Sequence, residues 1–219
     1  MCFSATASFT SGAVLIPVGM YCLRRAIKAS PQSVLFAVYP LGFGIQQIFE
    51  GLLWLSLGRQ LDCQYPAAFG FMFFSHFFWL WWVPLSVWWL EATGIRKNIA
   101  LGLTITGAVY GALMYFPVLL NDGWLQIVLM NHSIVYEARL IYDGFMPREL
   151  VRAIYAVIVV SSLLTTSDRY VRYFGILILL SVVLAKLFFD YAFISIWCFY
   201  AALLSVYIVY MLHKQARGV

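Results

Sequence analysis

An acidic side chain stands inside an apolar stretch, in the run Gly44-Ile45-Gln46-Gln47-Ile48-Phe49-Glu50-Gly51. A charge at the centre of a bilayer costs roughly 2.5–3.5 kcal/mol by insertion scales, so Glu50 requires a partner, water or a function. Gln46 and Gln47 precede it at helical spacing, so the three polar side chains share one helix face. Two interpretations remain open: a hydrogen-bond clamp between helices, and a ligand-binding or catalytic role.

A histidine lies in the next apolar stretch, in the run Phe73-Phe74-Ser75-His76-Phe77-Phe78-Trp79. A carboxylate beside an imidazole favours the protonated imidazole, which suits proton transfer, and the same two groups are ligands for a divalent metal such as zinc. We therefore predict that Glu50 and His76 meet as a catalytic or metal-binding pair. A histidine packed in the core is the alternative interpretation of His76.

Other residues complete this candidate site, with Gln46 and Gln47 alongside as pocket residues. Cys2 is a candidate metal ligand or nucleophile, and Ser4 a candidate pocket residue, because both precede the first apolar stretch. Cys198 lies about two turns inside the last stretch and is a further pocket candidate, or a buried apolar thiol. Lys186 and Asp190 are pocket candidates too, or a pair with each other, since they are four residues apart.

The four cysteines are Cys2, Cys22, Cys63 and Cys198. Their spacing contains no CxxC motif, so no zinc or redox motif is predicted from cysteine alone. A disulfide between Cys2 and Cys63 is a further possibility left open, because both are expected on the outer side.

The composition requires lipid around these residues. Of 219 residues, 63% are hydrophobic and only 11% are charged, whereas soluble domains average about 45–50% apolar and about 25% charged residues. Apolar runs of about 20 residues are the length of membrane-spanning helices. The net charge of +5 lies in short connections rather than on a basic face, so nucleic acid is not an expected partner.

The sequence predicts one domain, residues 1–219, forming an all-α bundle of seven transmembrane helices. Their expected ranges are residues 8–24, 33–57, 67–90, 99–120, 148–165, 170–189 and 191–212. We expect a kink at Pro84 in the third helix.

Positive charge predicts the orientation of the bundle. Basic residues follow the first, third, fifth and seventh helices: Arg24, Arg25, Lys28, Arg96, Lys97, Arg169, Arg172, Lys214 and Arg217. Short basic connections stay in the cytoplasm, which places the N-terminus outside and the C-terminus inside, in a bacterial inner membrane. Arg148 and Arg152, at the outer start of the fifth helix, depart from this pattern.

The connection over residues 121–147 is longer than the links usual between packed helices. Residues 124–130 and 133–140 are rich in β-branched and aromatic side chains, with Asn131-His132 between them. This pattern predicts a β-hairpin on the outer face between the fourth and fifth helices. An amphipathic helix at the interface is the alternative.

Three motifs carry a resemblance: the opening Met-Cys-Phe-Ser-Ala-Thr-Ala-Ser-Phe, the run from Gln46 through Glu50 to Trp54, and the tail Trp197-Cys198-Phe199-Tyr200-Ala201-Ala202. Together they resemble a family of prokaryotic membrane proteins with no assigned activity.

By architecture alone the chain is also similar to the seven-helix metal hydrolases grouped with alkaline ceramidases and adiponectin receptors. That resemblance implies zinc held by three histidines, two of them on the last helix. Here the last helix has no such pair. His76 and Glu50, completed by Cys2 or His132, are the nearest equivalent.

Three function classes follow: a metal-binding, hydrolase-like membrane enzyme, a sensor or receptor for a small molecule or lipid, and a transporter. The cytoplasmic halves of the helices carry few polar residues, which disfavours a through-path and hence the transporter.

Overall fold

The structure is a computed structural model that describes residues 4–58, 61–130 and 133–215. Its elements, in chain order, are α1 (Ala5–Ala29), η1 (Pro31–Ser33), α2 (Val34–Ala37), α3 (Tyr39–Leu57), α4 (Gln64–Met72), η2 (Phe73–Phe78), α5 (Trp79–Leu90), α6 (Ile95–Leu120), β1 (Leu125–Met130), β2 (Ser133–Ala138), α7 (Arg148–Thr165), α8 (Arg169–Phe188), η3 (Asp190–Ala192), α9 (Phe193–Leu204) and α10 (Tyr207–Gln215).

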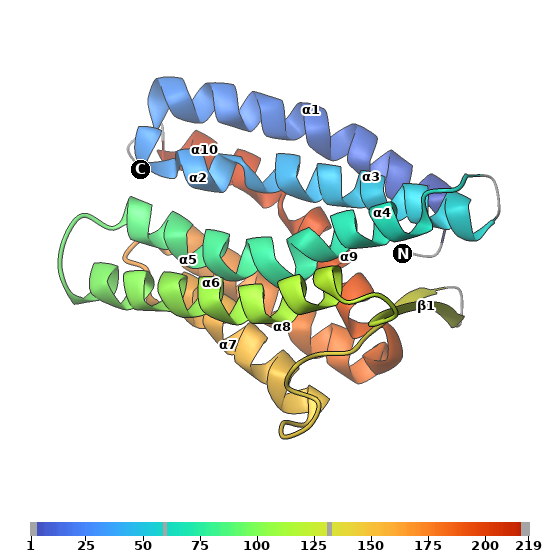
Figure 1. The fold of residues 1–219 in the computed structure, drawn as a ribbon. Helices are drawn as coiled ribbons and strands as arrows, with labels where there is room; N and C mark the ends of the chain where they lie inside the picture. Colours follow the sequence, from blue (N-terminus) through green and yellow to red (C-terminus); the bar gives the residue numbers. More distant parts are fainter. Residues whose placement is uncertain (1–3, 59–60, 131–132, 216–219) are drawn as a thin grey trace.

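Within the described residues these elements make seven helical passages along one long axis (Figure 1). The continuous helix made of α4, η2 and α5 is one passage, and η3, α9 and α10 form the last. The hairpin lies at the end where α1 begins, and α10 ends at the opposite end. The predicted all-α bundle with a hairpin between the fourth and fifth helices is therefore confirmed.

Five passages are long and apolar enough to cross a membrane: Ala5–Ala29, Gln64–Leu90, Ile95–Leu120, Arg169–Phe188 and Asp190–Gln215. These make the chain a multi-pass membrane protein. The other two, α3 and α7, have polar interruptions. α3 carries the Glu50 run, and α7 begins with Arg148, Glu149 and Arg152. The sidedness of the bundle and the identity of the membrane stay predictions.

Helix α1 packs closely along α3 through facing glycines. A Cβ atom on Gly44 would lie 2.8 Å from a side-chain carbon of Ile16, and one on Gly19 would lie 2.6 Å from Cβ of Leu41. Small residues allow helix backbones to approach in lipid, where packing rather than hydrophobicity drives association. Gly44 therefore faces α1.

Two predicted helices contain irregularities that the sequence did not predict. In the third predicted helix, residues Phe73–Phe78 form a π-helix, and this segment carries His76. Pro84, where the sequence predicted a kink, lies inside the α-helix α5 that follows. The second is interrupted at Val38, between α2 and α3, because Pro40 has no N–H to donate at this point of the helix. Single-turn π segments widen a helix locally and are frequent at functional sites.

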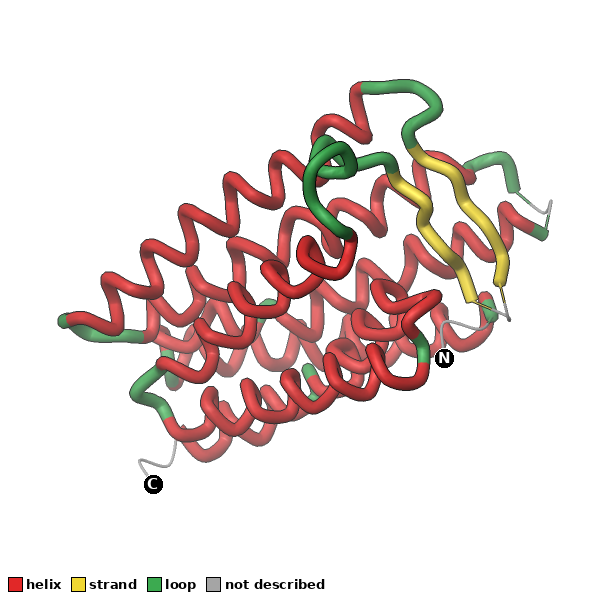
Figure 2. Tube along the Cα trace, turned by 90° about the horizontal axis from the view of Figure 1, so that it is seen from below, coloured by secondary structure: helices red, strands yellow, loops and turns green. Residues whose placement is uncertain are grey.

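The hairpin is antiparallel, with Leu125 opposite Ala138 and Met130 opposite Ser133 (Figure 2). Ile134 is fully buried, and the ring of Tyr136 stacks on Phe71 of α4 at 4.8 Å between centroids. This packing fixes the hairpin on the end of the bundle, and the alternative of an amphipathic helix is wrong. Asn131 and His132 lie outside the described residues.

Candidate functional site

Glu50 lies in a polar cluster between α3 and α9, and its side chain is fully buried. Oε1 accepts a hydrogen bond from Oγ of Ser195 at 2.6 Å, and Oε2 accepts one from Nε2 of Gln47 at 3.1 Å. The spacing of Gln47 and Glu50 at i and i+3 brings the two side chains together on one helix face. The carboxylate therefore joins α3 to the last passage of the bundle.

The two glutamines of this cluster retain hydrogen-bonding capacity. Gln46 accepts a hydrogen bond from the indole N–H of Trp79 at 2.8 Å through Oε1. Nε2 of Gln46 and Oε1 of Gln47 are buried and have no hydrogen-bond partner among the described residues. Buried polar atoms are nearly always paired, so these two atoms are the unused hydrogen-bonding capacity of the cluster.

His76 belongs to a different set of contacts. It is 2% exposed, and Nδ1 lies 2.9 Å from Oγ of Ser75. It lines a cavity of about 70 Å³ below the hairpin, which we call the hairpin cavity. Tyr136, Ala138 and Leu140 form the part of its wall that comes from the hairpin and the residues after it.

The polar wall of the hairpin cavity is rich in hydrogen-bond donors. It consists of Ser75, His76, Arg148, Arg152, Tyr155 and Trp197, together with the hydroxyl of Tyr136. No Asp or Glu is among the described residues that line it.

The donors of this wall differ in the partners that they already have. Nε of Arg148 lies 2.6 Å from Asp143, and Nη1 of Arg152 lies 3.0 Å from Asp190. The indole N–H of Trp197 is buried and has no partner within residues 4–58, 61–130 and 133–215. Asp143 and Asp190, which pair with the two arginines, are not among the residues that line the cavity. The lining therefore presents two arginines and several N–H and O–H groups, which favour an anion over a cation.

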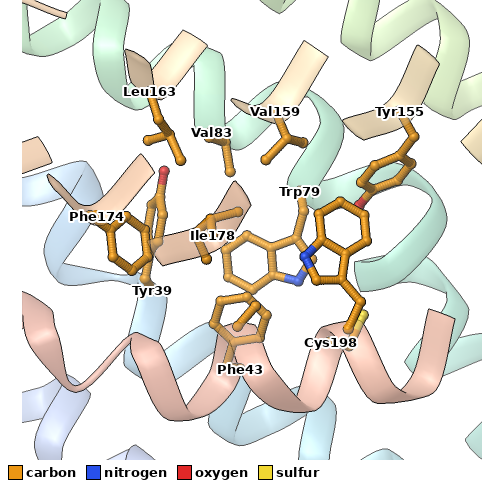
Figure 3. A pocket seen from close by; sticks show the side chains of 12 residues that line it. Tyr39, Phe43, Trp79, Val83, Tyr155, Val159, Leu163, Phe174, Ile178 and Cys198 are labelled. Atoms are coloured by element: carbon orange, nitrogen blue, oxygen red, sulfur yellow. The ribbon is translucent and has the colours of Figure 1, made fainter. Parts of the chain in front are cut away.

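A second, apolar space adjoins the hairpin cavity. This aromatic pocket measures about 40 Å³ and shares Tyr155, Trp197 and Cys198 with the hairpin cavity. Figure 3 shows Tyr155 and Cys198 at one end of the aromatic pocket, and Tyr39 and Phe174 at the other. The two spaces therefore form a polar compartment followed by an apolar one.

Rings define the middle of the aromatic pocket. Trp79 stacks on Phe43 with 4.0 Å between ring centroids, and aliphatic side chains such as Val159 and Ile178 line the opposite wall. The carboxamide of Gln46, which receives the N–H of Trp79, connects this pocket to the polar cluster.

The structure brings together some of the predicted site residues. Gln47 and Glu50 are hydrogen-bonded in the polar cluster, Gln46 beside them accepts from Trp79 of the aromatic pocket, and Cys198 lines both compartments. Glu50 does not line the hairpin cavity, so Glu50 and His76 take part in different described contacts. Their pairing stays a prediction.

Other predicted residues lie elsewhere. Ser4 is exposed and caps α1, accepting a hydrogen bond from the N–H of Ala7 at 3.2 Å. Lys186 and Asp190 form an ion pair of 2.6 Å at the hairpin end, outside the hairpin cavity. Cys63 is a free thiol in the structure, and a bridge to Cys2 stays a prediction. Cys2 itself lies outside the described residues.

Within the described part of the chain, no group of three or more His, Cys, Asp and Glu side chains is close enough to hold a metal ion. Protein zinc sites normally use three or four such ligands. The predicted site of His76, Glu50 and Cys2 therefore depends on a residue outside that part.

Four residues of the hairpin cavity were not predicted: Arg148, Arg152, Tyr155 and Trp197. The sequence contained a signal for the two arginines. Arg148 and Arg152 lie one turn apart at the start of a helix, on the side of the membrane that was expected to be poor in positive charge. Ionisable residues that break this pattern within a membrane helix are candidates for a site.

The five apolar spans and the compartments between them define a polytopic α-helical membrane protein with an internal, donor-lined cavity. The chain belongs to DUF6629, a family of unknown function, which it matches over residues 1–219. This agrees with the resemblance to a membrane family without assigned activity. No curated protein matches the chain, and no solved structure does.

Proposed function

We propose that this protein is a membrane receptor or sensor that binds a small carboxylic acid. The carboxylate occupies the hairpin cavity and the short apolar chain enters the aromatic pocket. The observation that carries the proposal is the lining of the hairpin cavity, which includes Arg148, Arg152, His76 and Trp197, whose N–H has no partner among the described residues, and no described Asp or Glu. The carboxylates that pair with the two arginines, Asp143 and Asp190, lie outside this lining.

The volumes determine the size of the ligand. A cavity of about 150 Å³ holds benzene. The hairpin cavity and the aromatic pocket measure about 70 and 40 Å³. Together they suit a molecule of a few non-hydrogen atoms, with a polar head and two or three carbons behind it. Butyrate has this size, whereas a membrane fatty acid is far larger.

Binding is favoured over the metal-dependent, hydrolase-like enzyme by the groups that face the cavity. Hydrogen-bond donors and arginines recognise an anion. A divalent metal requires three or four carboxylate, imidazole or thiolate ligands, and among the described residues the lining supplies only His76 and Cys198. Glu50 would act next to the site rather than in it. It holds Ser195 one helical turn before Cys198, and so fixes the wall that the two compartments share.

The test is thermal unfolding of the purified full chain in detergent with sodium butyrate. Sodium chloride of equal ionic strength and 1-butanol serve as controls. A ligand that binds only the folded state stabilises it by mass action, about 2.7 kcal/mol at a concentration of one hundred times Kd. Butyrate should raise the unfolding midpoint, and 1-butanol, which has the same chain length without the charge, should not.

Matched variants locate the effect. His76→Phe keeps a ring but removes the N–H donor, and should weaken butyrate binding by about tenfold or more, the value of a hydrogen bond to a charged group. His213→Phe, at the opposite end of the bundle, should leave it unchanged. Ile178→Trp fills the aromatic pocket and should block binding, whereas Ile176→Trp places the same ring on the exposed face of α8. Equal stabilisation by butyrate and 1-butanol, or equal butyrate affinity of His76→Phe and His213→Phe, would contradict the proposal.

A further inference from the structure

A groove of about 310 Å³ lies between α7 and α8 near the hairpin end of the bundle. We call it the lateral groove. Its apolar lining consists of Ala153, Ala156 and Val157 from α7, Val182 from α8 and Phe193 from α9. Val157 is 63% exposed, so the groove opens towards the space that lipid fills around a membrane bundle.

Four charged side chains gather at one end of the lateral groove. Arg152 and Lys186 line it, and Oδ1 of Asp190 accepts from both, at 3.0 Å and 2.6 Å respectively. Glu149 lines the groove as well. Asp190 accepts from Nη1 of Arg152 through both Oδ1 and its backbone oxygen, and from Nζ of Lys186 through Oδ1. Nη2 and Nε of Arg152 and further N–H groups of Lys186 therefore remain as donors for another anion.

We propose that the lateral groove binds a phospholipid with a phosphoethanolamine headgroup. The phosphate lies between Arg152 and Lys186, the ammonium donates to Glu149 and Asp190, and one acyl chain follows the apolar lining. This proposal goes beyond the proposed function, because its ligand is different and its site shares only Arg152 and Phe193 with the hairpin cavity.

Charge complementarity selects this headgroup. Two cations and two carboxylates match a group that carries one phosphate and one ammonium. A phosphocholine group has the same charges but no N–H with which to bond a carboxylate. A phosphoglycerol group has no positive charge to place against Glu149 and Asp190, and is repelled there.

The groove also adjoins the hairpin cavity. Arg152 and Phe193 line both, and the guanidinium of Arg152 lies over the ring of Phe193 at 5.6 Å. A phosphate that bonds Arg152 from the groove would therefore contact the outer side of the same wall that faces the cavity.

The experiment is native mass spectrometry of the full chain in detergent, titrated separately with palmitoyl-oleoyl phosphatidylethanolamine, phosphatidylcholine and phosphatidylglycerol. Phosphatidylethanolamine should bind about fivefold more tightly than either of the others, the upper range for an exposed ion pair. Glu149→Gln should reduce its preference over phosphatidylcholine. Lys186→Gln should weaken phosphatidylethanolamine binding by about fivefold, whereas Lys28→Gln, an exposed lysine at the opposite end, should not change it.

Equal binding of the three lipids would overturn the proposal, as would tighter binding of phosphatidylglycerol, which indicates attraction to positive charge alone. The proposal is also overturned if Lys186→Gln and Lys28→Gln bind phosphatidylethanolamine with equal affinity. Because Lys186 and Glu149 do not line the hairpin cavity, these variants should retain butyrate binding, so failure here is distinguishable from failure of the proposed function.

Discussion

Replacement of Gly107 by alanine tests the helix contact that positions His76. A Cβ atom on Gly107 of α6 would lie 2.7 Å from the carbonyl carbon of Leu80 and closer still to its oxygen. Optimal carbon contacts are about 3.5–4.0 Å, so α5 and α6 must separate by about 1 Å. The atoms that the new Cβ meets belong to the backbone of Leu80, so no change of side-chain rotamer can relieve the contact. Leu80 follows His76 by one helical turn, so the wall of the hairpin cavity must move as well.

Overpacking of this kind typically costs about 1–3 kcal/mol. For a domain of this size, that corresponds to a fall of roughly 2–12 °C in the unfolding midpoint. The assay is thermal unfolding in detergent, followed by butyrate titration. Gly102→Ala, on the same helix with nothing within 4 Å of its added Cβ, is the matched control and should be neutral or slightly stabilising. If Gly107→Ala were as stable as Gly102→Ala and bound butyrate equally well, the described α5–α6 contact would be refuted.

Three further predictions concern Glu50, the orientation of the bundle in the membrane, and Arg148. Glu50→Ala should lower the free energy of unfolding by about 1–3 kcal/mol, because it leaves buried donors without their acceptor. Glu50→Gln keeps an acceptor oxygen, so its free energy of unfolding should fall by less. Chemical denaturation of both variants in detergent measures the difference. In a chain whose native cysteines are replaced, a membrane-impermeant maleimide should label Asp62→Cys in intact cells, but Thr93→Cys only after lysis. Labelling of both in intact cells would contradict the orientation. Arg148→Gln removes a 2.7 Å bond to the carbonyl of Ala138 and should speed trypsin cleavage after Arg139; an unchanged cleavage rate would argue against this anchor.

Much of the fold could be predicted because it depends on local sequence. Apolar runs of helix length specify the passages, and the range expected for the fifth helix, residues 148–165, coincides with α7. The hairpin was recognisable because β-branched and aromatic residues surround Asn131-His132. The π segment was not predictable in this way. It shifts backbone hydrogen bonds by one residue over Phe73–Phe78, a segment that packs against α6, and local propensity does not encode such tertiary contacts.

The candidate site was predictable only in part. The spacing of Gln46, Gln47 and Glu50 placed them on one helix face, because i, i+3 and i+4 geometry is local. The partner of Glu50 is Ser195, far along the chain, and a single hydroxyl in an apolar helix gives no sign of its partner. The hairpin cavity likewise depends on Arg148 and Arg152 meeting His76 across three passages, which requires the tertiary arrangement.

Photo-crosslinking with 4,4-azipentanoate, a short carboxylic acid that carries a diazirine, tests the central claim most directly. The purified full chain is irradiated with the probe, and the modified residues are identified by peptide mass spectrometry, with and without excess butyrate. The account predicts adducts on Tyr155, or on Trp197 and Cys198, where the two compartments meet, and their loss when butyrate competes. Adducts confined to exposed side chains such as Ile176 and Leu180, or adducts that butyrate does not reduce, would contradict it.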